Sequence, residues 1–316
     1  MSVSGRPAAD VLRLHGKSFY FASWLLTPAF RLRSAQLYQF CRYVDDLVDE
    51  SDNIAESSTK LQHIRDSLCA DKVLTPEAEP IIQLKRQYGL PLDPILSLLD
   101  GVASDTTMTQ LPDEESLIQY AYSVAGTVGL LMCSVLEVKD HKAYPFAVDL
   151  GIAMQLTNIA RDVGEDATKN RIYLPASWVG TLNKDHVLNP DAQQRVAIIG
   201  GIKQLLELAQ QYYQSGLSGL SYLPTDARKG ILLAANIYAE IGQVIKDNDY
   251  RSWVSRATVS TPKKCWVAVR SIASYTLGNH IARKPTPTHN AKLHRYLAGF
   301  VGCSHDTTAT PRNQRG

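Results

Sequence analysis

Three oxygen-bearing side chains, Asn158, Asp162 and Asp166, lie four residues apart in the stretch 158–166, which reads NIARDVGED. On a helix, residues at this spacing share one face. Like charges so placed repel each other, and the stretch contains no lysine. Gln155 extends the same polar stripe. A solvated helix face usually interleaves lysine with its acids, so we expect positively charged groups from another element to lie opposite.

A second carboxylate cluster occurs in residues 41–50, CRYVDDLVDE, where Asp45 and Asp49 are also four residues apart. Either cluster alone is compatible with a charged, solvated helix, but two on otherwise apolar helices are more informative together. Such oxygen ligands suit Mg²⁺, which keeps several waters and binds one or two carboxylates plus phosphate oxygens. If the two helices face each other, they would hold a diphosphate through bridging metal ions.

Arginines flank both clusters: Arg42, Arg161 and Arg171. A surface ion pair is the commoner role for any one of them, yet the guanidinium also fits phosphate oxygens. Metal ions with arginine can ionise an allylic diphosphate because they neutralise the leaving group. The resulting carbocation must be kept from water and is stabilised by aromatic faces. Aromatic candidates, for each of which core packing is the alternative, are Phe19, Tyr20, Phe21, Tyr38, Tyr43, Tyr122 and Tyr238.

The elements that would position these groups are helices. Apolar residues at three- and four-residue spacing predict helices over 31–50, 114–138, 143–166, 192–217 and 224–247. Proline-containing stretches separate them, and we find no βαβ pattern, internal repeat or long linker. The sequence predicts a single all-α domain. We expect a flexible N-terminus (1–9), a helical domain (10–282) and a poorly ordered Pro/Thr-rich tail (283–316), with LHRYLAGFVG as a weak helix.

The bulk composition is that of an ordinary folded protein. The chain has 316 residues, a net charge of +2 and 45% hydrophobic residues, which gives no bias toward nucleic acid. Five scattered cysteines without a CxxC pattern indicate reduced thiols. The N-terminus has no signal-peptide pattern, and the longest apolar stretch, 124–136, is too short to span a bilayer. We therefore expect a cytoplasmic protein, with peripheral membrane contact left open.

Longer motifs resemble a known family. CRYVDDLVDE, YAYSVAGTVGLL and MQLTNIARDVGEDATKNRIYLPASW are similar to signatures of the squalene and phytoene synthases, the trans-isoprenyl diphosphate head-to-head synthases. GKSFYFAS resembles the N-terminal substrate segment of that family, and the match runs from about residue 10 to about 280. The resemblance, strongest to the bacterial phytoene synthases, implies an isoprenoid-synthase fold with a central cavity.

The resemblance also implies a reaction. Two geranylgeranyl diphosphates would condense head to head, through prephytoene diphosphate, to 15-cis-phytoene. The implied cofactor is Mg²⁺, with Mn²⁺ as the alternative, and no NADPH is expected. The implied partners are geranylgeranyl diphosphate itself and, by functional coupling, phytoene desaturase and geranylgeranyl diphosphate synthase.

Carried over by position, the resemblance assigns roles to individual residues. The implied metal ligands are Asp45, Asp49, Asn158, Asp162 and Asp166, with Arg42 and Arg161 beside them in catalysis. Implied diphosphate or chain contacts are His15, Ser18, Phe19, Tyr38, Gln155 and Arg171, and implied cavity tyrosines are Tyr122, Tyr173 and Tyr238. Some members carry a late phosphate-binding arginine. Here the region reads VSTPKKCW, so Lys263 or Lys264 would take that role.

Four other classes of protein share part of this pattern. A C30 synthase of squalene or dehydrosqualene, using farnesyl diphosphate, shares the motifs, and cavity depth would decide chain length. A head-to-tail elongase should carry a second DDxxD, which RDVGED does not match. A terpene cyclase should have a hydroxyl residue where Arg161 stands. A non-catalytic assembly partner would usually have lost motif carboxylates, and all of them are present.

Overall fold

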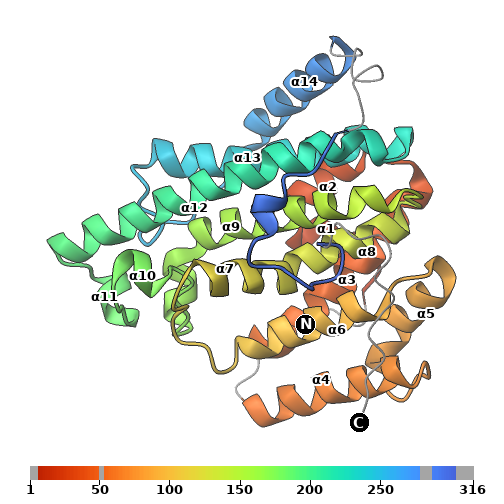
Figure 1. Cartoon of the computed structure of the whole chain (residues 1–316), viewed down its shortest axis with the longest axis horizontal. Helices are drawn as coiled ribbons and strands as arrows, with labels where there is room; N and C mark the ends of the chain where they lie inside the picture. The colour runs from red at the N-terminus through yellow and green to blue at the C-terminus, as the bar shows by residue number, and fades with distance from the viewer. Residues whose placement is uncertain (1–5, 50–52, 278–286, 304–316) are drawn as a thin grey trace.

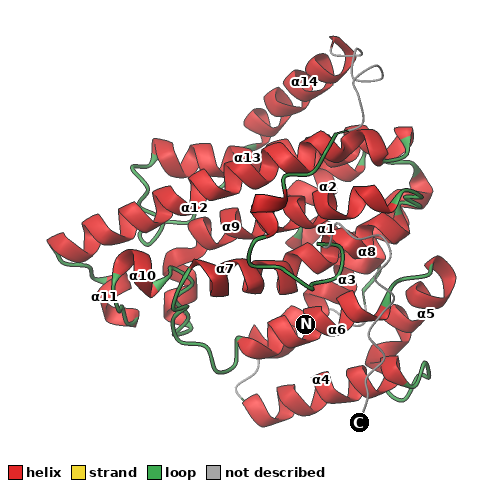
Figure 2. Ribbon diagram, in the orientation of Figure 1, coloured by secondary structure: helices red, strands yellow, loops and turns green. Residues whose placement is uncertain are grey.

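The fold is helical throughout the part of the chain that the structure describes. The computed structural model describes residues 6–49, 53–277 and 287–303, and within these ranges it has helices but no strand (Figure 2). An isolated parallel bridge joins Gln110 to Ile172. The prediction of an all-α fold is confirmed.

Five helical runs match the predicted ones within a few residues: α3 (Pro28–Asp49), the run Glu114–Val135, α9 (Tyr144–Thr168), α12 (Ala192–Ser218) and α13 (Thr225–Asp247). The second run consists of α7 (Glu114–Ala121), the π-helical turn η3 (Tyr122–Gly126) and α8 (Thr127–Val135). The remaining elements, for which we predicted no bounds, are α1 (Ala8–His15), α2 (Lys17–Ser23), α4 (Ile54–Cys69), η2 (Pro76–Ala78), α5 (Glu79–Tyr88), α6 (Leu92–Ser104), η4 (His141–Ala143), α10 (Ala176–Val179), α11 (Lys184–Leu188), η5 (Gly219–Tyr222), α14 (Thr261–Leu277) and η7 (Ala291–His294).

Helix α9 occupies the centre of the bundle. It packs most extensively on α12 and also contacts α8, α13 and η3. In Figure 1, α13 and α12 cross the upper half of the molecule, α4 lies at the lower edge, and α14 projects from the top. Because α9 carries one acidic motif, its burial fixes that motif against neighbours on several sides.

Two glycines allow α8 and α9 to pack closely. A Cβ on Gly129 would lie 2.1 Å from the carbonyl oxygen of Ala147, and one on Gly151 would lie 2.2 Å from that of Ala125. Both distances are far below a van der Waals contact, so only glycine fits at either position. The small residues of VAGTVG therefore serve close helix packing, and the same stretch also lines the cavity described below.

Residues 287–303 pack on the bundle. Leu293, Leu297 and Cys303 are buried in the largest hydrophobic cluster, and the Tyr212 hydroxyl donates to the Leu293 carbonyl at 2.7 Å. This differs from the poor order that the composition predicts, because apolar anchors interrupt the polar sequence. Only the short η7 forms where we expected a weak helix. The predictions for residues 1–5, 278–286 and 304–316 lie outside the described residues.

The run Glu114–Val135 is long and apolar enough to cross a membrane by length and composition alone. Half of its most apolar window is buried inside the fold, and Leu117, Ile118 and Leu131 are fully buried core residues. A core helix passes the same test, and this packing indicates a core helix.

Candidate active site

An apolar cavity of about 320 Å³ lies between α2, α3, α8, α9 and α13. Most of its lining is aliphatic, and its polar lining includes Tyr38, Gln155, Asn158 and Tyr238. The predicted central cavity is therefore present. Its size falls within the usual range for small-molecule pockets.

Both acidic motifs lie one helical turn beyond the same end of this cavity. The lining from α3 ends at Cys41, four residues before Asp45, and the lining from α9 ends at Asn158, four residues before Asp162. The two helices thus pass the cavity in the same chain direction. Their carboxylates meet at one end, which we call the mouth.

The first motif is tied directly to the end of α9. Asp49 accepts hydrogen bonds from Lys169 at 2.8 Å and from Arg171 at 2.5 Å. Burial alone would raise the pKa of Asp49, but these two cations outweigh it and lower that pKa. The structure therefore brings Arg171 to the first motif.

Asp45 lies among like charges. Its pKa is raised to about 7 by burial and then by the neighbouring Asp49 carboxylate, while Arg42 opposes the shift. Because 46% of the Asp45 side chain is still exposed, solvent weakens the effect of burial, and we attribute the raised pKa mainly to the Asp49 carboxylate. Arg42 is shared between Asp45 at 3.4 Å and Asp46 at 2.5 Å. A divalent cation would relieve the crowding of these carboxylates.

The second motif has the positive partners that its spacing predicts. Asp162 forms ion pairs with its neighbour Arg161 at 2.5 Å and with Arg256 at 2.8 Å. Arg256 also reaches Glu165 at 3.5 Å. Each motif therefore contains one aspartate held by two cations, Asp49 by Lys169 and Arg171, and Asp162 by the two arginines.

Helix α9 is kinked at the second motif and packs closely on another segment there. Asp162 has φ −103° and ψ 15°, outside the helical region, so the helix is kinked at the motif. A Cβ on Gly164 would lie 2.7 Å from the carbonyl oxygen of Trp253. Gly164 thus lets the segment after α13 approach α9, and that segment carries Arg256 onto Asp162.

The donor set at the mouth fits a hard divalent cation. The Oδ1 atom of Asn158 is buried and has no hydrogen-bond partner among the described residues. The pKa of Asp166 is raised well above its usual value by burial and by Asp162. The unsatisfied amide oxygen and the crowded carboxylates together form a set of oxygen donors, which are the ligands that Mg²⁺ prefers. The structure thus gathers all five predicted metal ligands at one end of the cavity.

Aromatic rings lie next to the cavity just inside the mouth. The ring of Phe19 lies 4.7 Å from that of Tyr238 and 6.1 Å from that of Tyr38, and all three residues line the cavity. Gln155 lines it too and accepts from the Asn158 amide at 3.3 Å. These four side chains stand where the resemblance places substrate contacts.

Comparisons with known proteins agree with this geometry. Residues 12–263 match the family model described as squalene/phytoene synthase. The chain belongs to the squalene/phytoene synthase family. It is 31% identical over 296 residues to the 15-cis-phytoene synthase of Pantoea ananas, covering 89% of this chain and 95% of that protein. It is 32% identical over 324 residues to the phytoene synthase of Cereibacter sphaeroides, covering 97% of this chain and 88% of that protein.

Solved structures share the fold. A dehydrosqualene synthase crystallised with a ligand matches with a TM-score of 0.73 and 25% identity, covering 85% of this chain and 95% of that one. The squalene synthase HpnC of Alicyclobacillus acidocaldarius matches with a TM-score of 0.65 and 22% identity. That match covers 77% of this chain and 93% of the other. The predictions of family, isoprenoid-synthase fold and prenyltransferase class are confirmed. The family is one of divalent-metal-dependent prenyl synthases.

Not every residue suggested by the family resemblance lies at the cavity. Tyr122 is buried and donates its hydroxyl to the Val301 carbonyl at 2.9 Å, so it is a core residue that holds the C-terminal segment. Tyr173 donates to Asp105 at 2.8 Å, behind the mouth. His15 is exposed at the end of α1. Neither His15 nor the half-buried Ser18 is among the residues that line the cavity.

Three residues at the mouth of this family member carry no local sequence signal: Asp105, Lys169 and Arg256. Asp105 accepts hydroxyl hydrogen bonds from Tyr173 and from Tyr120 at 3.0 Å, and its carbonyl accepts from Arg171 at 3.1 Å. Burial raises the pKa of Asp105 to about 6, against the opposing effect of the tyrosine hydroxyls and Arg171. Asp105 therefore positions Arg171 beside Asp49.

The two late lysines have different surroundings. Lys263 pairs with Glu240 at 3.0 Å and with Asp247 at 3.7 Å, which ties α14 to α13. The pKa of Lys264 is lowered by burial and by the charge of Lys17 at the start of α2. Lys264 is thus the better candidate for an anion contact.

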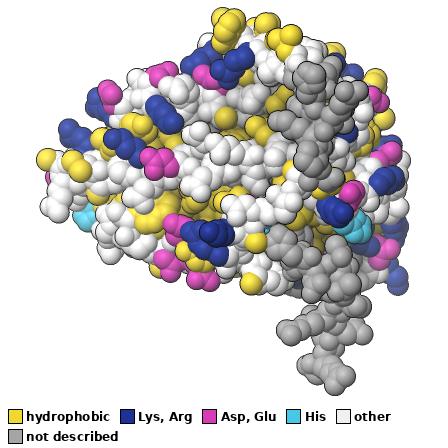
Figure 3. Space-filling view, turned by 45° about the horizontal axis from the view of Figure 1, so that its top comes forward, with side chains coloured by type: hydrophobic (Ala, Val, Ile, Leu, Met, Phe, Trp, Pro, Cys, Tyr) yellow, Lys and Arg dark blue, Asp and Glu magenta, His cyan; other side chains and the backbone are white. Residues whose placement is uncertain are grey.

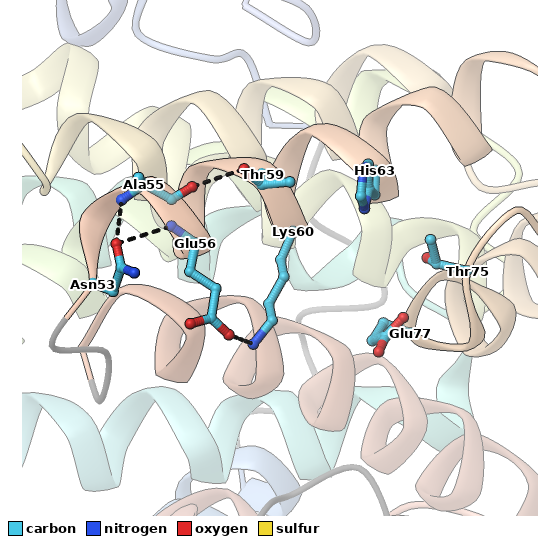
Figure 4. A pocket seen from close by; sticks show the side chains of 8 residues that line it. All are labelled: Asn53, Ala55, Glu56, Thr59, Lys60, His63, Thr75 and Glu77. Atoms are coloured by element: carbon cyan, nitrogen blue, oxygen red, sulfur yellow. Dashed lines mark hydrogen bonds and ion pairs between the residues drawn. The ribbon is translucent and has the colours of Figure 1, made fainter.

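A second hollow lies at the surface beside α4 and η2 (Figure 4). It contains the Asn53 side chain, which caps α4 by accepting from two backbone amides, and the Glu56–Lys60 ion pair at 2.6 Å. Neither acidic motif nor any predicted substrate contact contributes to it. Helix capping and ion pairing account for Asn53, Glu56 and Lys60, whereas Thr75 Oγ1 is buried without a hydrogen-bond partner among the described residues.

Proposed function

We propose that this protein is a phytoene synthase, which condenses two geranylgeranyl diphosphates head to head, through prephytoene diphosphate, to 15-cis-phytoene. The observation that carries the proposal is the meeting of two carboxylate motifs at one end of an apolar cavity. Relatives at 31–33% identity that are named phytoene synthases favour the C40 product over a C30 product. We assign the synthase domain to residues 10–282, with 287–303 packed on it.

The mouth would bind the two diphosphates. Asp45, Asp49, Asn158, Asp162 and Asp166 would hold Mg²⁺, with Mn²⁺ as the alternative, and the ions would neutralise the departing diphosphate. When the aspartates bind metal, the cations that now pair with them become available to phosphate oxygens. Arg171, Lys169 and Arg256 would then be free to bind phosphate oxygens in place of their carboxylate partners.

The cavity would receive the hydrocarbon chains and protect the carbocation. Its aliphatic walls exclude water, which would otherwise capture the cation. Phe19, Tyr38 and Tyr238 present ring faces or edges just inside the mouth, where positive charge develops. The overall condensation releases two diphosphates and two protons, one of each at either step, and needs no reductant.

A product assay tests this proposal. Purified protein with Mg²⁺ is given geranylgeranyl diphosphate or farnesyl diphosphate, each with and without NADPH, and the extracted hydrocarbon is identified by mass and ultraviolet spectrum. A C40 hydrocarbon with a triene chromophore, independent of NADPH, is expected. A C30 product would instead place the enzyme with the dehydrosqualene or squalene synthases. No hydrocarbon from either substrate would favour the non-catalytic interpretation.

The lysine pair offers a matched test of diphosphate binding. Within the part of the chain that the structure describes, neither Lys17 nor Lys264 forms an ion pair with a carboxylate, and their charges lie close enough to repel. We expect Lys264→Ala to raise KM for geranylgeranyl diphosphate, because the pair would share a phosphate group. Lys263→Ala is the control, since Lys263 is already paired with Glu240. Equal KM values for the two variants would remove Lys264 from the site.

We also propose a cytoplasmic enzyme that contacts membranes peripherally. Helix α14 exposes Trp266, Val269 and Leu277 at 63%, 63% and 82% of their surface. Figure 3 shows hydrophobic side chains beside Lys and Arg at the upper edge, where α14 projects in Figure 1. The substrate has a lipid tail and the product is an oil, so both would partition into a membrane. Contact with the membrane would therefore couple this enzyme functionally to geranylgeranyl diphosphate synthase and phytoene desaturase. In a flotation assay with anionic vesicles, wild type should float with the vesicles and Trp266→Glu should stay in the unbound fraction. Equal flotation of the two proteins would contradict the membrane contact.

A further inference from the structure

A second cluster of ligand-bearing side chains lies away from the mouth. Asp149 of α9 is fully buried, and its two carboxylate oxygens contact His289 Nε2 at 2.8 Å and His294 Nε2 at 2.7 Å. The Ser215 hydroxyl of α12 donates to the same carboxylate. The cluster therefore joins α9, α12 and the segment 287–303.

This cluster is short of positive charge. The described ion pairs of Asp149 are to the two histidines and to no lysine or arginine. With both imidazoles neutral, the cluster carries one negative charge in a place without solvent, which is costly unless a cation balances it. A bound cation would supply the missing charge.

The donor set suits zinc better than magnesium. Each of the three side chains offers one ligand atom, and these atoms lie within 4.8 Å of one another. Zinc binds imidazole nitrogen and carboxylate oxygen at about 2.0–2.2 Å, so side-chain movements of about 1 Å would close the site. Mg²⁺ prefers oxygen ligands alone. Ser215 stands at the carboxylate as a fourth polar group.

The cluster is separate from the mouth but touches the cavity wall. Asp149 precedes Asn158 by nine residues, which is about 14 Å along a helix. The His289 ring packs edge-to-face on Phe146, with centroids 5.4 Å apart, and Phe146 lines the cavity. A cation held here would fix the wall of the cavity and the C-terminal segment rather than contact a diphosphate.

We propose that Asp149, His289 and His294 bind a structural Zn²⁺ ion that fastens residues 287–303 to α9 and α12. The ion would cross-link three parts of the chain that are distant in sequence. Its loss would loosen the C-terminal segment and leave the metal ligands at the mouth in place.

Metal analysis of the full-length protein tests this proposal. Protein produced with zinc in the medium is dialysed against buffer with excess Mg²⁺, which occupies the carboxylates of the mouth, and its zinc is measured by mass spectrometry. We expect one equivalent of zinc in wild type and in Asp162→Ala, and none in His294→Ala. His63→Ala, which removes a histidine of the surface hollow in Figure 4, is the matched control and should keep its zinc.

A second measurement covers the case in which His294→Ala does not fold. Wild type stripped with a chelator is titrated with Zn²⁺ or Co²⁺ while its melting temperature and visible spectrum are followed. We expect a higher melting temperature with Zn²⁺, no comparable rise with Mg²⁺, and the d–d bands of a four-coordinate ion with Co²⁺. If wild type is isolated without zinc and its melting temperature does not change on addition of Zn²⁺, the proposal is overturned. Zinc retained equally by His294→Ala would also overturn it.

Discussion

The two halves of α9 carry polar clusters that differ in what holds them. Toward its C-terminal end, Asp162 pairs with Arg161 and Arg256 at the mouth, and 51% of the Arg256 side chain is exposed. Toward its N-terminal end, Asp149 is fully buried against two histidines. Partners in contact with solvent can leave when a ligand arrives, and fully buried partners cannot. We therefore assign chemistry to the first cluster and cohesion of the fold to the second.

The largest expected effect comes from removing the acid at the mouth. Asp162→Ala should lower kcat about 10³-fold, because the carboxylate would hold the metal that stabilises the leaving diphosphate. Its melting temperature should stay close to that of wild type, and the exposed control Asp66→Ala should keep full activity. Adding Asp49→Ala should cost little more, since both ligands serve one assembly. Full activity of Asp162→Ala in a folded protein would refute its role.

The buried end of α9 should respond in the opposite way. Asp149→Asn places an amide donor against the imidazoles and breaks a buried pair, which typically costs about 3–5 kcal/mol of unfolding free energy. The turnover of the fraction that stays folded should be close to wild type. Urea unfolding followed by circular dichroism measures the first quantity and the product assay the second. A variant with wild-type stability and lost turnover would reverse our division of α9.

Asp105 behaves as an intermediate case, because it is buried yet supports the mouth. Its folded-state pKa of about 6 lies above the usual Asp value of about 3.9, so ionisation costs stability as pH rises through that window. Asp105→Asn lacks this cost. The unfolding free energy of the variant relative to wild type should therefore increase from pH 4 to pH 6 and level off above pH 7. A difference that is constant with pH would contradict the shift.

The smallest effect should come from Tyr122, which the family resemblance places at the cavity and the structure places in the core. Tyr122→Phe removes one hydrogen bond to the Val301 carbonyl and should cost about 1 kcal/mol of stability. KM and kcat for geranylgeranyl diphosphate should not change. A large rise in KM would return Tyr122 to the cavity.

Sequence spacing groups the carboxylates of the mouth because each motif is local. Asp45 and Asp49, like Asn158, Asp162 and Asp166, each share a helix face, so periodicity alone groups them. Among their cationic partners, Arg161 and Arg171 were named from the sequence, but Lys169 and Arg256 were not. Arg256 reaches Asp162 only because Gly164 admits the segment after α13, and no periodicity encodes that approach.

Contacts between residues far apart in the sequence could not be predicted from local patterns. His289 and His294 lie about 140 residues from Asp149 and within a stretch whose composition predicts poor order. Their pairing depends on Leu293 and Leu297 being buried, a tertiary event that no local pattern signals. The helices of the bundle, by contrast, were predicted because amphipathic periodicity is a property of each segment alone.

The most direct test of the central claim is the Mg²⁺ dependence of diphosphate release from geranylgeranyl diphosphate, measured for wild type, Asp162→Ala and Asp149→Asn at a temperature where all three are folded. Our account predicts saturable Mg²⁺ activation with the same midpoint in wild type and Asp149→Asn, and no activation in Asp162→Ala. Mg²⁺ activation that survives in Asp162→Ala and is lost in Asp149→Asn would contradict it.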